Sequence, residues 1–473
     1  MPQRQLVWFR NDLRCADHRA LCAASAKGEV IALISPCYGQ WREHGHGANK
    51  LDFWYRNAKA LAAQLDTLNI PMQVLEAERF DQVPEALVDR ARALGCSALH
   101  FNDEYAVNER ERDRRVAEAC RAAGLEVHRH TDAVQFAPGE LRTGKGEYYS
   151  VFTPFAKAWH RALEGSRLKP SPMPERQPAP TDVVNEELPA PPRPATIDTA
   201  LWPAGEEEAQ ARLSRFIRDR LRLYQRNRDF PAQAATSALS AYLAIGAIST
   251  RQCLNAVLHH NHGHLADGDA GTSAWVNELV WREFYQHILV GYPQVCRHRP
   301  FRQEAQRIRW RDAPEELEAW RQGRTGYPLI DAAMRQLVET GWMHNRLRMV
   351  TAMFLTKHLL IDWREGEAFF LDHLVDGELG ANNGGWQWAA STGTDAAPYF
   401  RLFNPTTQSR RFDPDGAFIA SWLEGFEELD AKARHAPSAQ QREACGYPAP
   451  IVDHRAARER ALSTFAAAFK HHG

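Results

Sequence analysis

The segment DGELGANNGGWQWAASTGTD, residues 376–395, combines five glycines, two adjacent asparagines and two tryptophans. Glycine and asparagine permit backbone conformations that other residues resist, whereas tryptophan is large and usually buried. Because Trp386 and Trp388 are two positions apart, their indoles point to opposite faces of a strand or lie about 200° apart on a helix. The two side chains therefore cannot contact the same neighbour. Core packing explains such a pair taken alone, and a flat polar ligand against the glycine-rich backbone is the second interpretation.

Around this segment, from about residue 205 to the C-terminus, apolar residues recur at helical spacing. Strand signals are nearly absent, and nine of the 14 tryptophans lie at or beyond residue 275. The pattern predicts a large all-α domain. Its predicted helices span residues 206–223, 249–259, 273–290, 314–323, 329–340, 345–361 and 365–374.

The first 130 residues have a different pattern. Short apolar runs that read as strands (6–9, 30–35, 72–75, 98–101 and 125–129) alternate with amphipathic helices (49–68, 81–94 and 108–123). Such alternation predicts a parallel, Rossmann-like sheet with helices on both faces. The first strand is followed by RNDLR and not by GxGxxG, so the domain is not an obvious NAD site.

A proline-rich segment separates these two regions. Residues 170–203 contain ten of the 27 prolines, which indicates an extended linker without regular structure, and a helix over 151–163 precedes it. We therefore expect an α/β domain over 1–130, a linker over 131–204 that is partly helical and then proline-rich, and a helical domain over 205–473.

The composition is that of an ordinary globular protein of 473 residues with a formal net charge of −1. The eight cysteines form no CxxC, which argues for reduced thiols. No apolar run approaches the roughly 18–20 residues that a membrane helix needs, and MPQRQLVWFRNDLR has no apolar signal core, so we expect a soluble cytoplasmic protein. Residues 297–311 hold six arginines against one acid, Glu304, which suits either a solvated face or a phosphate-binding surface.

Several motifs remain ambiguous on their own. HHNHGH, residues 259–264, lacks accompanying metal-ligand spacing and is better read as a solvated loop than as a metal site. There is no HExxH, GxSxG or Walker loop. TSALS, residues 236–240, suits phosphate binding at a helix start, but capping of that helix is the simpler interpretation.

Two helical motifs also allow two interpretations. WVNELVWREFYQHI, residues 275–288, places Glu278, Trp281, Arg282 and Tyr285 on one face or on adjacent faces of a helix. The carboxylate is either a structural ion-pair partner or a group directed at a ligand. GWMHNRLRM, residues 341–349, is either a helix start with surface arginines or a ligand-facing turn with an arginine free to bind phosphate.

Taken together, LVWFRNDLR, YAVNER, VFTPF, RDFP, TSALS, the two helical motifs and the segment from residue 376 to TTQ at 408 resemble the DNA photolyase/cryptochrome flavoproteins. The match is closest to class I cyclobutane pyrimidine dimer photolyases of the folate-antenna type and covers nearly the whole chain. The resemblance implies an antenna-binding α/β domain, a helical domain that holds FAD, and a carbon–carbon lyase. Reduced, anionic FAD would give an electron, under light, to a dimer flipped out of DNA, so no acid–base machinery is needed.

The resemblance also assigns residues to the flavin. Asn382 matches the residue facing the flavin N5 edge, where a neutral amide suits the reduced cofactor. Trp310, Trp363 and Trp386 match a chain that carries electrons from the surface to oxidised flavin, on three separate helical elements. The remaining flavin-pocket positions are Tyr224, Thr236, Ser237, Ala238, Leu239, Ser240, Trp275, Arg282, Trp342, Asn345, Arg348, Asp376, Gly377 and Glu378.

On the DNA side, Glu278 matches the acid that hydrogen-bonds the dimer, while Trp281 and Trp388 would stack against it. The resemblance implies damaged DNA as the partner, and a monomer with no membrane association and no obligate protein partner. The other DNA-contacting positions are Arg228, Tyr285, Asn345, Arg346, Met349 and Gln408.

For the antenna, methenyltetrahydrofolate is implied, at His44, Asn108, Glu109, Cys296 and Arg297. Arg297 departs from the lysine expected there, which keeps the charge and changes the geometry. Glu378 in place of aspartate and Ala238 within TSALS are departures in the flavin pocket.

Two relatives of this family are the rival interpretations. A six-four photolyase would carry a histidine pair where this chain has Asn345 and Met349. A cryptochrome, which is a light receptor, often carries a long C-terminal extension, and here LSTFAAAFKHHG follows soon after the matching region. We therefore expect repair of pyrimidine dimers.

Overall fold

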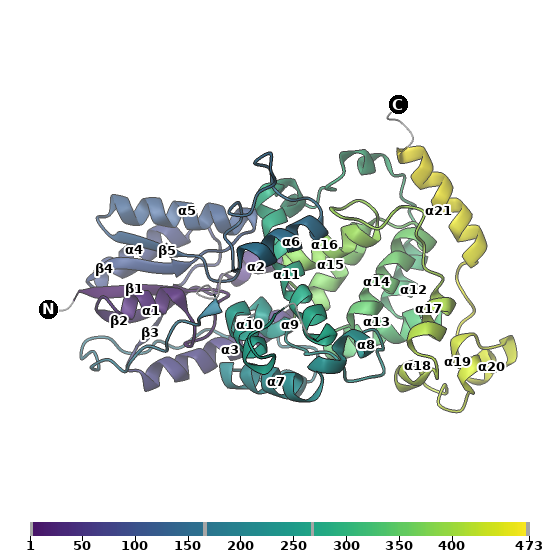
Figure 1. The fold of residues 1–473 in the computed structure, drawn as a ribbon, viewed down its shortest axis with the longest axis horizontal. Helices are drawn as coiled ribbons and strands as arrows, with labels where there is room; N and C mark the ends of the chain where they lie inside the picture. The colour runs from purple at the N-terminus through teal and green to yellow at the C-terminus, as the bar shows by residue number, and fades with distance from the viewer. Residues whose placement is uncertain (1–2, 164–167, 266–268, 470–473) are drawn as a thin grey trace. The chain divides into compact units, whose positions relative to one another are not determined.

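The computed structural model describes residues 3–163, 168–265 and 269–469, with its helices and strands labelled in Figure 1. The chain forms two compact units. The N-terminal unit comprises residues 1–225 and 237–293, and the C-terminal unit comprises residues 226–236 and 294–473. The domain boundaries that we predict after residues 130 and 204 stay a prediction.

The N-terminal unit contains a five-stranded parallel sheet in the order β3-β2-β1-β4-β5. The strands are β1 (Arg4–Phe9), β2 (Glu29–Ile34), β3 (Met72–Val74), β4 (Cys96–Asn102) and β5 (Glu126–His130). β1 is central, pairs with β2 from Arg4↔Glu29 to Phe9↔Ile34, and is almost wholly buried. The predicted α/β class, the parallel sheet and all five strands are confirmed.

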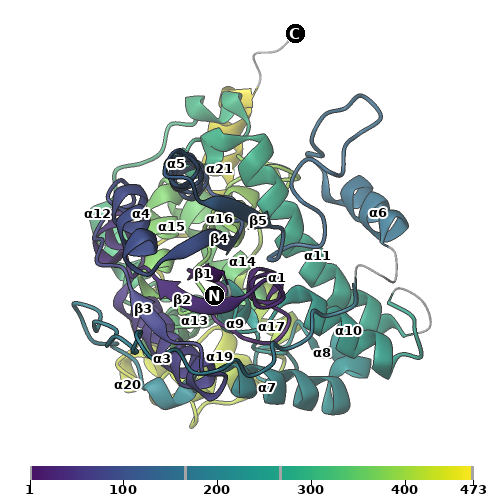
Figure 2. The same ribbon diagram turned by 90° about the vertical axis from the view of Figure 1, so that its left-hand side faces the viewer.

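Helices cover both faces of this sheet. Figure 2 shows α1 (Arg19–Ser25) and α3 (Ala48–Thr67) on one face and α4 (Val83–Ala93) and α5 (Val107–Ala122) on the other. The apolar stripe of α3 that predicted a helix is buried, including Trp54, Leu61 and Leu65. α1 and the short α2 (Tyr38–Glu43) were not predicted.

The proline-rich segment lies against the sheet. Residues 169–198 contain no helix or strand, as predicted. Gln177 accepts a hydrogen bond from the Val30 backbone N–H at 2.8 Å and donates one to the Val30 carbonyl at 2.9 Å. Further along, the Glu186 N–H donates to the Met72 carbonyl at 2.9 Å. The linker is therefore fixed to β2 and β3 over much of its length.

The rest of the N-terminal unit is helical. Its helices are α6 (Phe152–Ala162), α7 (Glu206–Asp219), α9 (Ser240–Ala244), α10 (Thr250–His260) and α11 (Ala270–Gly291), with short 3-10 turns η2 (Thr199–Leu201) and η3 (Leu221–Leu223). α8 (Tyr224–Asn227) lies where the two units meet in sequence.

The C-terminal unit is helical, as predicted. Its first helices are α12 (Pro314–Arg321), α13 (Pro328–Thr340), α14 (Asn345–Met353), α15 (Trp363–His373) and α16 (Leu379–Ala389), preceded by η4 (Pro293–Arg297) and η5 (Gln303–Arg307). The last are α17 (Pro405–Phe412), α18 (Ala417–Trp422), α19 (Ala431–His435), α20 (Ala439–Ala444) and α21 (His454–Phe469).

The predicted helix over 345–361 is present, but only its first half is α-helical. After Met353 the chain continues as a π-helix, η6 (Phe354–Leu359), and it ends at Leu360, which is left-handed with φ 55°. Segment 379–389 is a helix, which decides between the two geometries left open for Trp386 and Trp388.

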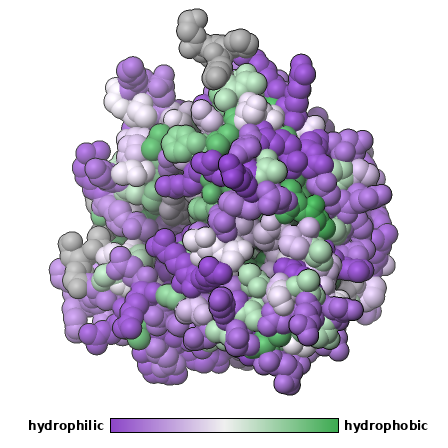
Figure 3. Space-filling view, turned by 90° about the vertical axis from the view of Figure 1, so that its right-hand side faces the viewer, coloured by the Kyte–Doolittle hydropathy of each residue, from purple (hydrophilic) through white to green (hydrophobic). Residues whose placement is uncertain are grey.

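Among the residues described, no helix is long and apolar enough to cross a membrane. On the face in Figure 3, hydrophilic residues predominate and hydrophobic ones form separate patches.

Candidate functional site

Helix α16 is held against α15 by the buried carboxyl and carbonyl groups of Glu367. The Asn382 side-chain N–H donates to the Glu367 backbone carbonyl at 3.0 Å, and the Asn383 side-chain N–H donates to Glu367 Oε1 at 2.8 Å. Gln387 donates in turn to Asn383 Oδ1 at 2.9 Å. Glu367 also pairs with His298 at 2.8 Å, and this hydrogen bond raises the pKa of His298. The amide of Asn382 is thus oriented with its oxygen left over as an acceptor.

An ion pair joins α14 to the segment that leads into α16. Arg348 Nη2 lies 3.0 and 2.8 Å from the two carboxylate oxygens of Asp376, and Arg348 Nε donates to the Met343 carbonyl at 2.8 Å. Asp376 is buried, whereas Glu378, the N-cap of α16, is half-buried and makes no side-chain cap bond. Two predicted flavin-pocket residues, Arg348 and Asp376, are therefore brought together. Gly377 lies between Asp376 and Glu378.

Other side chains at the start of α14 do not take part in the Arg348–Asp376 pair. Arg346 pairs with Asp229 at 2.9 Å, and its guanidinium carbon lies 4.4 Å from the ring centre of Phe412. Asn345 is exposed, while Trp342 and Met349 are half-buried. Arg346 and Arg348 therefore take different acidic partners.

The three tryptophans of the predicted chain occur along the core of the C-terminal unit. Trp386 and Trp363 are 2% and 1% exposed, and Trp310 is half-buried. The Trp386 ring lies directly against Gly366, one turn after Trp363 on α15, because a Cβ added at Gly366 would meet the indole at 2.0 Å. Trp363 and Trp310 line one cavity. Trp310 lies in the loop between η5 and α12, so our expectation of three helical elements is wrong for it.

Trp388 leaves α16 on the other side from Trp386. It is half-buried and packs at the edge of the hydrophobic core that contains Trp386. Of the other residues predicted to contact DNA, Gln408 lies in α17 and is half-buried, and Arg228 is half-buried in the segment before residue 236.

In the N-terminal unit, α11 carries the aromatic positions. Trp281 stacks face to face on Phe152, with ring centres 3.6 Å apart and planes 7° apart. Tyr285 lies 5.7 Å from Trp281 between ring centres. Trp275 and Tyr224 are buried and pack against the same ring, Phe216. Glu278 is half-buried between Trp275 and Trp281 in the sequence of the helix.

Sequence reasoning missed the most buried acid of this helix, Glu283. It accepts hydrogen bonds from the backbone N–H groups of Gln135 and Phe136 at 2.7 and 3.0 Å and from the Trp159 indole at 3.0 Å. Burial raises its pKa to about 7. Its neighbour Arg282 donates to the Ala133 and Leu243 carbonyls at 3.0 and 3.2 Å. Glu283 and Arg282 fix α11 to the loop at residues 133–136 and to helices α6 and α9, and no local sequence signal distinguishes Glu283 from Glu278.

The TSALS segment is not a helix cap. Leu239 is the N-cap residue of α9, and its side chain makes no capping hydrogen bond. Ala238 adopts a left-handed conformation with φ 50°, which turns the chain sharply before Ser240, the first residue of the helix. The capping interpretation is therefore wrong, and the predicted phosphate-binding role of Thr236, Ser237 and Ser240 stays a prediction.

The antenna positions of the N-terminal unit lie together. His44 Nδ1 lies 3.4 Å from Glu109 Oε1, and Asn108 Nδ2 lies 2.9 Å from His44 Nε2. Cys296 and Arg297 belong to η4 in the C-terminal unit, and Arg297 is exposed. Their part in an antenna site stays a prediction.

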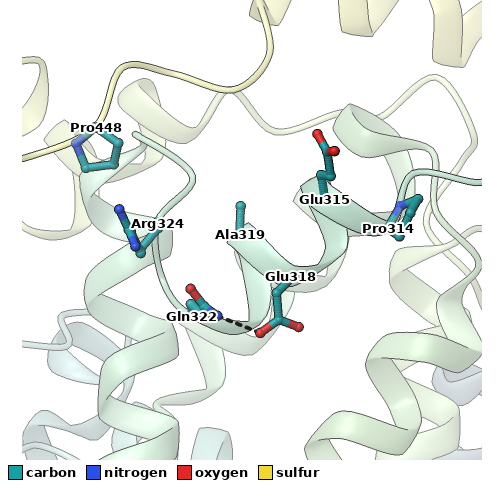
Figure 4. A pocket seen from close by; sticks show the side chains of 7 residues that line it. All are labelled: Pro314, Glu315, Glu318, Ala319, Gln322, Arg324 and Pro448. Carbon is teal, nitrogen blue, oxygen red and sulfur yellow. Dashed lines mark hydrogen bonds between the residues drawn. The ribbon is translucent and has the colours of Figure 1, made fainter.

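Two cavities contain no predicted site residue. One, of about 740 Å³, is lined by His259, His262 and His264 of the HHNHGH loop together with His160 and several leucines. The other, of about 520 Å³, lies beside α12 in Figure 4, where Glu318 accepts a hydrogen bond from Gln322 and Arg324 lies at one end. Within the described ranges no three histidine, cysteine or acidic side chains could hold a metal ion.

Comparison with known proteins gives the following relationships. Residues 5–179 match the model of the DNA photolyase domain, and residues 275–467 match that of the FAD binding domain of DNA photolyase. A deoxyribodipyrimidine photo-lyase of Salmonella typhimurium is 45% identical over 98% of this chain and 99% of its own length. One from Escherichia coli is 44% identical with the same coverage.

Solved structures agree with this relationship. A class III photolyase from Agrobacterium tumefaciens superposes with a TM-score of 0.89 at 34% identity, over 99% of this chain and 98% of that one. A cryptochrome from Synechocystis superposes with a TM-score of 0.85 at 27% identity, over 98% of this chain and 99% of that one.

Proposed function

The chain belongs to the DNA photolyase family, and we propose that it is a carbon–carbon lyase that uses light to repair cyclobutane pyrimidine dimers in DNA. The full-length similarity to deoxyribodipyrimidine photo-lyases supports this activity over a receptor function or six-four repair. The structural observation that carries the proposal is the arrangement of α16. On this one helix the Asn382 amide is oriented by Glu367, Trp386 is buried in the core, and Trp388 is half-buried at the edge of that core.

The polar side chains of the candidate site suit FAD as a ligand. The amide nitrogen of Asn382 is used by Glu367, so its oxygen, which has no donor within the described ranges, suits an N–H group of a reduced flavin edge. FAD, when bound, supplies the one-electron chemistry that light drives. We propose that Arg348 and Asp376 position the pocket wall beside it, and that the hydroxyls of Thr236, Ser237 and Ser240 face its phosphates. The other proposed contacts are Tyr224, Ala238, Leu239, Trp275, Arg282, Trp342, Asn345, Gly377 and Glu378.

For the substrate, we propose that the Glu278 carboxyl hydrogen-bonds the dimer and that Trp281 and Trp388 stack against it. The stack of Trp281 on Phe152 supports this role, because one face of the indole is fixed by the protein and the ring is only half-buried. Tyr285, Asn345 and Met349 would lie beside the lesion. Arg228, Arg346 and Gln408 would contact the DNA, and the arginines of 297–311 would widen the phosphate-binding surface despite the net charge of −1.

We propose that Trp310, Trp363 and Trp386 form a relay that brings electrons from the surface. Burial disfavours a charged group, so an oxidised indole is more stable at the half-buried Trp310 than at Trp363 or Trp386, which are almost inaccessible. The positive charge therefore moves outward along the relay. Indole suits this role because it is among the more readily oxidised side chains.

The finer assignments are also proposals. The contact of His44 with Glu109 and Asn108 supports methenyltetrahydrofolate as the antenna, together with Cys296 and Arg297. We further propose a cytoplasmic monomer with no obligate protein partner.

The decisive experiment uses an oligonucleotide that carries one thymine dimer. The purified protein is added with and without illumination, and restored thymines are measured by chromatography. Restoration in the light alone is the expected result. Binding of the oligonucleotide without restoration would indicate a cryptochrome, and repair of a six-four product only would indicate the other photolyase class.

A further inference from the structure

A cavity of about 570 Å³ lies in the C-terminal unit at the outer end of the proposed relay. Trp310 and Trp363 both line it, and its other lining side chains include Arg299, Gln306, Asp362 and Arg364. Arg299 and Gln306 are exposed, whereas Trp363 is buried. The cavity is thus open to solvent and is lined by two indoles of the proposed relay. Its volume is in the range of pockets that hold small organic molecules.

The charges around this cavity, which we call the Trp310 cavity, favour an anion. Arg364 is already committed, because it pairs with Asp362 at 2.8 Å and donates to the His298 carbonyl at 2.7 Å. The side chain of Arg299 makes no hydrogen bond or ion pair with any residue within 3–163, 168–265 and 269–469. Asp362 is the one acid in the described lining, so one positive charge is left uncompensated. The neighbouring Arg307 and Arg309 are exposed and add to the positive potential.

The proposed relay requires an electron donor for Trp310. Each electron that reaches the cofactor leaves an oxidised indole at Trp310, and that indole must regain an electron before the charge returns inward. A donor that meets Trp310 only by random collision competes poorly with this return. A donor held in the Trp310 cavity would already be in contact with the indole that it must reduce.

We propose that the Trp310 cavity binds a small anionic enediolate reductant, of which ascorbate is the type, and that this ligand re-reduces Trp310. The inference rests on the proposed relay. A planar ring can lie against the half-buried indole of Trp310, and two adjacent oxygens match the fork of the Arg299 guanidinium. The exposed amide of Gln306 provides a further polar contact at the rim.

The electron transfer balances as follows. The ascorbate monoanion gives one electron to the Trp310 radical cation, which keeps its N–H proton and becomes a neutral indole. The ascorbate loses its remaining enediol proton to water and leaves as the ascorbyl radical anion. No further oxidant or reductant is required.

Flash spectroscopy of the flavin-containing protein tests the proposal. The decay rate of the tryptophan radical is measured against ascorbate concentration for the wild type and for Arg299→Gln. A bound donor gives a rate that saturates, and loss of the charge-assisted contact weakens the apparent affinity by about tenfold. Arg324→Gln is the matched control, because Arg324 is an exposed arginine that lines the separate cavity beside α12 (Figure 4). It should leave the curve unchanged.

A second measurement does not depend on light. Titration calorimetry in the dark, without oxygen, should detect ascorbate binding by the wild type and by Arg324→Gln, and binding about tenfold weaker by Arg299→Gln. A rate that stays linear with ascorbate, with the same slope in Arg299→Gln, would overturn the binding site. Equal losses of ascorbate affinity in Arg299→Gln and Arg324→Gln would indicate a general charge effect and would also overturn the binding site. Absence of any tryptophan radical after the flash would instead refute the relay on which the inference rests.

Discussion

Replacement of Gly366 by alanine tests the contact on which the inner end of the relay depends. An added Cβ would lie 2.0, 2.3 and 2.6 Å from three ring carbons of Trp386, so the two groups must separate by about 1 Å even to reach the shortest contact that real Cβ atoms make. Trp386 has little room to move. Its ring centre is 4.9 Å from that of Phe370 and 6.0 Å from that of the fully buried Trp320.

Overpacking of this kind costs about 1–3 kcal/mol of unfolding free energy. Alanine favours a helix over glycine by roughly 0.5–1 kcal/mol, which offsets part of the loss, so we expect a net destabilisation of about 1–2 kcal/mol. The displaced indole should also slow photoreduction, whereas repair by protein reduced beforehand with dithionite should persist.

Gly385→Ala provides the matched control. Gly385 is exposed on α16, and an added Cβ there would meet nothing within 4 Å. The same substitution should therefore leave stability unchanged or raise it by up to about 1 kcal/mol. Denaturant unfolding followed by tryptophan fluorescence gives the free energies, and absorbance under blue light gives the photoreduction rate. If Gly366→Ala is as stable as Gly385→Ala and photoreduces at the wild-type rate, the close packing of Trp386 on α15 is refuted.

Three further predictions concern single residues. Trp310→Phe keeps an aromatic ring but removes the oxidisable indole, so it should block photoreduction and leave repair by pre-reduced protein intact; loss of both activities in the same assays would contradict the relay. Asp376→Asn removes the charge that faces Arg348 and should cost roughly 1–3 kcal/mol and lower the ratio of FAD to protein after purification, measured by absorbance; an unchanged ratio would argue against a pocket role for this pair. Burial lowers the pKa of Lys357, which donates to Ser391 and to the Arg401 carbonyl, to about 7. Above that pH the unfolded chain binds more protons than the folded one, so the free energy of unfolding should rise between pH 7 and 8.5 by up to about 2 kcal/mol. Lys357→Met should flatten this rise in parallel denaturation curves.

The sequence-based predictions succeed where the stabilising contacts lie within one helix or strand, and they fail where those contacts join segments distant in sequence. Strand β1 and helix α3 follow from burial patterns contained within one element, and both are found where expected. The break at Leu360 has no such signal, because a π-helix and a left-handed leucine depend on what packs around the turn. Motif resemblance located Arg348 and Asp376, and the structure pairs them.

The missed residues share one property, which is that their partners are distant in sequence. Glu367 acquires its role from asparagines 15 and 16 positions away, and Glu283 from backbone groups more than 140 positions away. Gly366 matters only because an indole from another helix occupies the space of its missing side chain. Local periodicity carries no information on such pairings.

The path of the linker has a consequence for association of the protein with itself. β3 is an outer strand of the sheet, and an outer strand with free backbone groups is a template for pairing with another chain. Here the Met72 N–H is bonded to Asn185 Oδ1 at 2.7 Å and the Val74 N–H to Glu186 Oε2 at 2.7 Å. The chain thus closes its own exposed edge with the side chains of Asn185 and Glu186 and with the Glu186 backbone N–H, which donates to the Met72 carbonyl. Shortening the proline-rich segment should therefore leave the fold of the sheet intact yet produce concentration-dependent aggregates through β3.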